Sequence, residues 1–195
     1  MEEKVYKNNK EMIYFSIHII FFILAGMIIF GFLSEIINKF YPLESLPPFV
    51  MDFGNFIFLI IKAPIAEEVI FRKWTFDFLK KKTKYYNIIQ ALIFALWHKY
   101  FIQKIYTFIL GVFLGNVKDK KGNIWLCIYL HMLFNITGIY LKDFYLGFID
   151  SIIKMLNMEN NLLFMTIVLI IMFILHTAGF IWSLKKIGKG FYKLF

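Results

Sequence analysis

Cysteine is nearly absent from this sequence, and charged residues are scarce. Cys127 is the single cysteine, so no disulfide can form within the chain. Because it stands in an apolar run, we expect it to be a small packing residue. Only 18% of the 195 residues are charged, whereas a soluble domain carries about 25%. The low charge excludes an ordinary soluble domain.

Proline and polar linkers are also rare. Three of the four prolines lie in segment 41–48, and the fourth is Pro64. No polar linker is longer than a few residues, so we expect a single integral membrane domain over residues 1–195. Period-2 alternation is absent, which excludes a β-barrel. Internal repeats are absent as well, which argues against a transporter built from paired broken helices.

Apolar residues make up 60% of the chain and aromatic residues 21%. Segments 12–32 and 161–182 are apolar runs longer than the roughly 18 residues that indicate a membrane span. No small-x-small cleavage site follows the first run, so we do not expect a cleavable signal peptide. The sequence predicts an all-α, polytopic membrane helix bundle with about six crossings and roughly eight helices, counting broken or half-spanning ones.

The net charge of +9 comes from lysines that stand between the apolar runs. In a soluble protein this charge would indicate nucleic acid, but here we expect no nucleic-acid partner. Lysines next to spans set the topology and contact anionic lipid. Lysines cluster near both ends of the chain and in segments 80–84 and 118–121. This pattern predicts a multi-pass protein of the cell membrane with both termini in the cytoplasm.

Two adjacent carboxylates and a guanidinium interrupt an apolar stretch. Pro64 is expected to break or restart a helix there, because it lacks a backbone donor. In the following helix, expected over residues 65–79, Glu68 and Arg72 are four apart, which favours an ion pair. Glu67 points about 100° away and stays free to act. Charged groups at membrane depth are energetically costly and usually functional. The alternative is a Glu–Arg ion pair with a purely structural role, which holds two helices together.

Histidines form the second set of candidates. His98 ends a short apolar helix, and His131 and Asn135 are four apart, so they share one helical face. A histidine in an apolar helix is usually a packing residue with a satisfied hydrogen bond. We expect that role for His18 and His176, which have no comparable polar neighbours in the sequence.

Gly111 and Gly115 stand four apart in the apolar segment 106–117. Small residues at this spacing let two helices approach closely within a membrane. We expect packing within the chain rather than a dimer contact.

Three motifs occur in a fixed order along residues 64–137, and each joins residues four apart. They are Glu67-Glu68-x-x-x-Arg72, Phe94-x-x-x-His98 and His131-x-x-x-Asn135. In order and spacing they resemble the motifs of the CPBP family. These are intramembrane proteases, named for CAAX and bacteriocin processing and also called Abi proteins.

The resemblance implies hydrolysis of peptide bonds inside the membrane. Glu67 is then the general base, since a carboxylate in a low-dielectric cavity can accept a proton from water. His98 would hold the same water. His131 and Asn135 would donate hydrogen bonds to the oxyanion, each contributing about 3 kcal/mol. No serine, nor the lone cysteine, stands near the motifs as a nucleophile, so a covalent route is not expected.

Glu68 and Arg72 would fix the helix and tune the base. We expect no cofactor, but a catalytic zinc held by Glu67, His98 and His131 is the alternative, because two histidines and a glutamate suffice as ligands. Against zinc, the histidines stand on separate helices rather than in one His-Glu-x-x-His motif.

The function expected from these residues is that of an endopeptidase acting on small or extended membrane-associated peptides. Its partners would be membrane lipid and the peptide substrate. Eukaryotic relatives imply prenylated C-terminal tails as substrates, and bacterial relatives imply leader or bacteriocin-type peptides. The alternative is a non-enzymatic bacteriocin-immunity or peptide-binding membrane protein.

Overall fold

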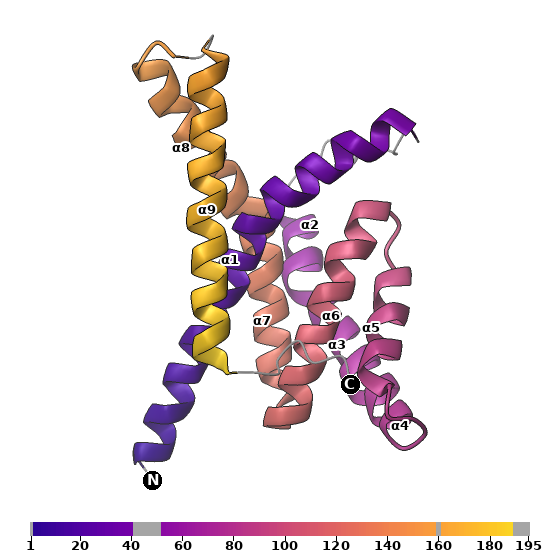
Figure 1. The fold of residues 1–195 in the computed structure, drawn as a ribbon. Coiled ribbons are helices and arrows are strands. Elements are labelled where there is room, and N and C mark those ends of the chain that lie inside the picture. Colours follow the sequence, from indigo (N-terminus) through magenta and orange to yellow (C-terminus); the bar gives the residue numbers. More distant parts are fainter. Residues whose placement is uncertain (1, 41–51, 159–160, 189–195) are drawn as a thin grey trace. The chain divides into compact units, whose positions relative to one another are not determined.

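The computed structural model describes residues 2–40, 52–158 and 161–188. All regular structure in these residues is helical, which confirms the all-α prediction. The elements, with η marking π-helical segments, are α1 (Glu2–Phe40), α2 (Phe53–Ile57), η1 (Phe58–Lys62), α3 (Ala63–Glu68), η2 (Val69–Thr75), α4 (Phe76–Lys80), α5 (Tyr86–Leu96), α6 (Phe101–Lys121), α7 (Ile124–Ile136), η3 (Thr137–Leu141), α8 (Lys142–Met155) and α9 (Leu162–Ile187) (Figure 1).

Three helices among the described residues are long and apolar enough to cross a membrane. They run over Asn9–Phe40, Ile124–Met155 and Leu162–Ile187, and Tyr86–Leu96 is a shorter apolar helix. The chain is therefore a membrane protein, as expected. The count of six crossings stays a prediction, and the proline-rich segment 41–48 lies outside the described residues.

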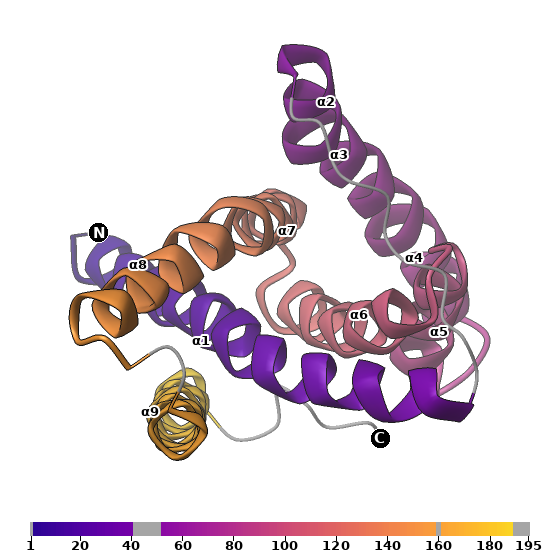
Figure 2. The same cartoon turned by 90° about the horizontal axis from the view of Figure 1, so that it is seen from above.

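The helix that carries the glutamates does not stop at Pro64. From Phe53 to Lys80 the chain is helical without a gap, and only the hydrogen-bonding pattern changes (Figure 2). At the end of η1 the backbone N–H of Ala63 donates to the carbonyl of Phe58, five residues back. Pro64 then stands in the first turn of α3, where a missing backbone donor is tolerated. Of the two expectations, a break is wrong, whereas a restart agrees with the structure, because the α-helical pattern begins again as α3 after a π-helical turn.

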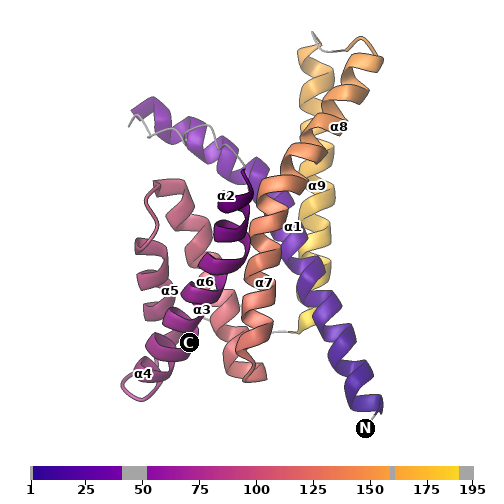
Figure 3. The same cartoon turned by 180° about the vertical axis from the view of Figure 1, so that it is seen from behind.

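A second expected boundary is also absent. The sequence predicts a span that ends near Leu141 and a separate short helix over residues 144–156. In the structure α7, η3 and α8 form one continuous helix from Ile124 to Met155 (Figure 3). No proline stands between residues 124 and 155 to interrupt the helical hydrogen bonding.

The contacts divide the chain into two compact units. One comprises Met1–Phe32 and Leu133–Ile187, and the other comprises Leu33–Met132 and Gly188–Phe195. The second unit contains every candidate site residue except Asn135. A single membrane domain over the whole chain stays a prediction.

Within the first unit, two histidines have hydrogen-bond partners that are distant in the sequence. His18 is fully buried, and its Nδ1 lies 2.8 Å from the Ser183 hydroxyl oxygen, while its ring stacks on Phe180. His176 Nε2 lies 3.0 Å from the hydroxyl of Tyr145. The predicted packing role of both histidines is confirmed.

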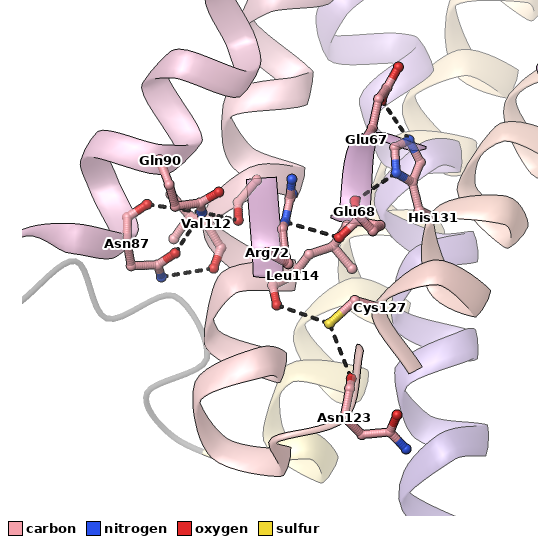
Figure 4. Close-up of polar contacts among 11 residues, drawn as sticks. Glu67, Glu68, Arg72, Asn87, Gln90, Val112, Leu114, Asn123, Cys127 and His131 are labelled. Atoms are coloured by element: carbon pink, nitrogen blue, oxygen red, sulfur yellow. Dashed lines mark hydrogen bonds and ion pairs between the residues drawn. The ribbon is translucent and has the colours of Figure 1, made fainter. Parts of the chain in front are cut away.

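Within the second unit, α5 packs against α6 through the two glycines. Buried amides complete the contact (Figure 4). Gln90 donates to the carbonyl of Gly111 at 3.0 Å and to the side-chain oxygen of Asn87 at 2.8 Å. Asn87 donates to the carbonyl of Val112 at 3.1 Å. Gly115 faces these amides, so the predicted packing within the chain is confirmed.

Gly115→Ala should destabilise this contact, because a Cβ at Gly115 would overlap the side-chain oxygen of Asn87. Overpacking of this kind costs roughly 1–3 kcal/mol. Thermal unfolding in detergent should therefore show a lower midpoint. Gly31→Ala is the matched control, since nothing lies within 4 Å of a Cβ there. Equal midpoints for the two variants would contradict the close approach of α5 and α6.

Candidate active site

The centre of the site is a buried trio of charged and polar side chains. Glu68 ends α3, and Arg72 follows one turn later in η2. Arg72 Nε lies 3.1 Å from Glu68 Oε2, and both side chains are 0% exposed. His131 of α7 donates from Nδ1 to Glu68 Oε1 at 2.8 Å (Figure 4). The predicted Glu68–Arg72 pair is confirmed, whereas the sequence did not indicate the His131 contact.

Phe94 joins this trio to the second histidine. Its fully buried ring lies under the Arg72 guanidinium, at 4.4 Å from ring centroid to carbon. The rings of His98 and His131 stand nearly perpendicular to it, with centroids 4.9 and 5.8 Å away. The three nitrogens of Arg72 and the Oε2 atom of Glu68 have no hydrogen-bond partner among the described residues. The buried guanidinium is therefore compensated by its ion pair with Glu68 and by the π face of Phe94. Phe94 belongs to a sequence motif, but the motif did not indicate a role for it.

Glu67 differs from its neighbour in both exposure and contacts. Its side chain is 20% exposed, and its Oε2 lies 3.6 Å from His131 Nε2. This distance is too long for a hydrogen bond. Glu68 is therefore paired with Arg72 at one oxygen and hydrogen-bonded to His131 at the other, whereas Glu67 remains available to accept a hydrogen bond. The two side chains differ in this way because adjacent residues point about 100° apart around a helix.

Hydrogen-bond chemistry fixes the tautomers of both site histidines. His98 Nδ1 lies 2.9 Å from the carbonyl oxygen of Phe94, and because a carbonyl only accepts, this nitrogen carries the proton. His131 Nδ1 carries a proton for the same reason, since its partner Glu68 is a carboxylate paired with Arg72. In the neutral rings both Nε2 atoms keep their lone pairs. Each can accept a hydrogen from water.

The same tautomers bear on the zinc alternative. Metal-bound histidines typically donate their other N–H to a carboxylate or a backbone carbonyl, as His131 and His98 do here. The arrangement does not fit, however: in the described part of the chain no three side chains of the types His, Cys, Asp and Glu are grouped closely enough to hold a metal ion.

Asn135 lies one helical turn after His131 on α7. It belongs to the first compact unit. Its role as a second oxyanion donor stays a prediction.

Cys127 lies on the same helix, one turn before His131. It is completely buried, and its Sγ is 3.5 Å from the carbonyl oxygens of Leu114 and Asn123 (Figure 4). Burial raises the cost of a thiolate, so the residue does not act as a nucleophile. The expected packing role is confirmed.

The helices and the charged site define a class: a membrane protein with a buried polar centre. The family model described as Type II CAAX prenyl endopeptidase Rce1-like matches residues 16–137, which is more than half of the chain. The chain belongs to this Rce1-like family, which confirms the resemblance to CPBP proteases. It is a CAAX-protease-like hydrolase that acts on peptide bonds. Comparison with curated proteins and with solved structures gives no significant match.

Glu68→Gln should lower stability strongly, because it leaves the buried Arg72 without its counter-charge. Breaking a buried pair by removing one partner costs about 3–5 kcal/mol. The thermal midpoint in detergent should fall well below that of Glu67→Gln, the matched change at the neighbouring, partly exposed carboxylate. The double variant Glu68→Gln/Arg72→Met should recover part of the loss. Equal midpoints for the two single variants would contradict the stabilising role of the trio.

Proposed function

We propose that the chain is an intramembrane endopeptidase in which Glu67 activates the water that hydrolyses the peptide bond. The contrast between the two adjacent carboxylates is the observation that supports this most. Glu68 is fully buried and bound on both oxygens by Arg72 and His131, whereas Glu67 is partly exposed and makes only a 3.6 Å approach to His131. A general base needs an available lone pair and access to water, and only Glu67 has both.

In the proposed reaction, Glu67 takes one hydrogen of a water molecule while His98 Nε2 accepts a hydrogen bond from the other. The resulting hydroxide adds to the peptide carbonyl carbon, and the carbonyl electron pair moves onto oxygen. When this pair returns, the C–N bond breaks and Glu67 gives its proton to the departing nitrogen. Glu67 thus ends as it began, and the products are a carboxyl group and an amine.

His131 would stabilise the oxyanion from Nε2, for which the ring must carry a proton on both nitrogens. Glu68 lies at Nδ1 and Glu67 near Nε2, so a carboxylate stands at each end of the ring. Asn135 would be the second donor and needs no change of protonation. Each such donor contributes roughly 2.7–4 kcal/mol to transition-state stabilisation.

The substrate we propose is a small or extended membrane-associated peptide. The described helices are joined by short connections, so no large accessory structure is available there to hold a folded protein. We further propose a multi-pass protein of the cell membrane with cytoplasmic termini, on the basis of the lysine pattern. The non-enzymatic alternative has no observation in its favour, since the family is one of endopeptidases.

Glu67→Gln should abolish hydrolysis, because glutamine keeps the volume and the hydrogen bonding but cannot take a proton. The loss should be at least about 10²-fold. Release of a fluorophore from prenylated and unprenylated peptides by purified protein in liposomes measures it. Asp77→Asn, which neutralises an exposed carboxylate on α4, should leave the rate unchanged. Near-wild-type turnover of Glu67→Gln on a confirmed substrate would show that another group is the base.

Chelation should leave turnover essentially unchanged if Glu67 alone activates the water. A membrane-permeant chelator added to the same liposome assay tests this, with zinc content measured on the purified protein. The zinc alternative predicts the opposite, since metal removal would cost both activity and stability. Stoichiometric zinc and full inactivation reversed by added metal would make Glu67, His98 and His131 metal ligands.

A further inference from the structure

Two basic turns meet at one end of the second unit. The first comprises residues 80–84, at the end of α4 and directly after it, and the second comprises residues 118–121, at the end of α6. Asp119 joins them, because one of its oxygens accepts a hydrogen bond from Lys80 and the other accepts one from the Tyr86 hydroxyl at 2.9 Å. The bond to Asp119 raises the pKa of Lys80, so this lysine stays protonated at neutral pH.

The two turns gather positive charge from parts of the chain that are 39 residues apart. Their lysines are Lys80, Lys81, Lys82, Lys84, Lys118, Lys120 and Lys121. All of them except Lys118 are exposed. The carboxylates in and next to these turns are Asp77 and Asp119, and the second is engaged by Lys80. We call this set of seven lysines the basic face, and its charge is strongly positive.

Large exposed aromatic side chains flank the basic face. Trp74 and Phe78 precede the first turn and are 64% and 62% exposed, and Trp125 follows the second turn and is 69% exposed. Lys84 lies over the ring of Tyr85 at 5.0 Å. Tryptophan and tyrosine beside lysine are typical of the boundary between hydrocarbon and headgroups, where a ring contacts apolar chains and an ammonium group contacts phosphate.

We propose that the basic face binds the headgroups of anionic phospholipids, with Trp74, Phe78 and Trp125 in the adjoining acyl-chain boundary. The exposed aromatic side chains favour a lipid surface over an acidic protein, because they lie on helices that continue into the apolar body of the unit. Asp119 holds the two turns together, so that their lysines act on one patch of lipid. This surface is independent of the proposed hydrolysis.

Quenching of tryptophan fluorescence by brominated lipids tests the proposal, since Trp74 and Trp125 adjoin the face. The full chain is reconstituted in phosphatidylcholine vesicles with about one third phosphatidylglycerol, and either lipid carries the bromine. The test variant replaces Lys81, Lys82, Lys84 and Lys118 by glutamine. The control replaces the same number of lysines elsewhere, namely Lys39, Lys62, Lys99 and Lys104.

The wild type and the control should be quenched more by the brominated anionic lipid, and the test variant should lose this preference. Each lysine near an anionic surface contributes roughly a fivefold preference, so the local enrichment should be at least about that large and should fall with added salt. Equal quenching by both lipids in the wild type, or an unchanged test variant, would overturn the proposal.

Two further experiments test whether the basic face binds an anion other than lipid. Loss of the preference on adding millimolar inorganic phosphate at constant ionic strength would overturn the lipid assignment in favour of a free-phosphate site. A labelled polyglutamate peptide should bind weakly to the wild type in pure phosphatidylcholine vesicles. Tight binding that depends on the same four lysines, without a lipid preference, would point instead to an acidic protein partner.

Discussion

The burial of the Glu68 carboxylate is the constraint on which the site depends. A charge removed from water costs several kcal/mol unless opposite charges and hydrogen bonds replace the solvent. Arg72 and His131 supply them to the two oxygens of Glu68. Because these partners come from the helix over residues 53–80 and from α7, the same interaction that neutralises the carboxylate joins the two helices. It also fixes the ring orientation of His131.

A second constraint places α5 and the site residues Phe94 and His98. Without water, apolar helices gain little from apolar contact alone, so close packing and amide hydrogen bonds hold them together. Gln90 and Asn87 bond to α6 beside the two glycines. Phe94 follows Gln90 by one turn of α5, which ends at Leu96, and His98 lies just beyond the helix with its Nδ1 2.9 Å from the carbonyl oxygen of Phe94. The amide contact therefore sets where the Phe94 ring meets Arg72, and where His98 presents its Nε2 atom.

Local spacing was enough to predict the helices, the Glu68–Arg72 pair and the role of the glycines, because each follows from the period of a helix. It could not predict the contact between Glu68 and His131, which are 63 residues apart; that contact depends on tertiary packing. Local rules also left open whether the hydrogen bond lost at Pro64 would break the helix or restart it. A π-helical turn accommodates the proline, since a small change of backbone pattern costs less than unpaired groups in an apolar setting.

Charge balance connects the buried trio to the proposed chemistry. Arg72 and Glu68 carry opposite charges and are neutral together, which suits a membrane interior. When Glu67 accepts a proton from water in the proposed reaction, the site loses one negative charge while negative charge develops on the substrate oxygen. The proposed proton transfer thus strengthens the attraction of the site for the oxyanion at the moment it forms. A single carboxylate could not provide this, because the one that neutralises Arg72 cannot also give up its charge.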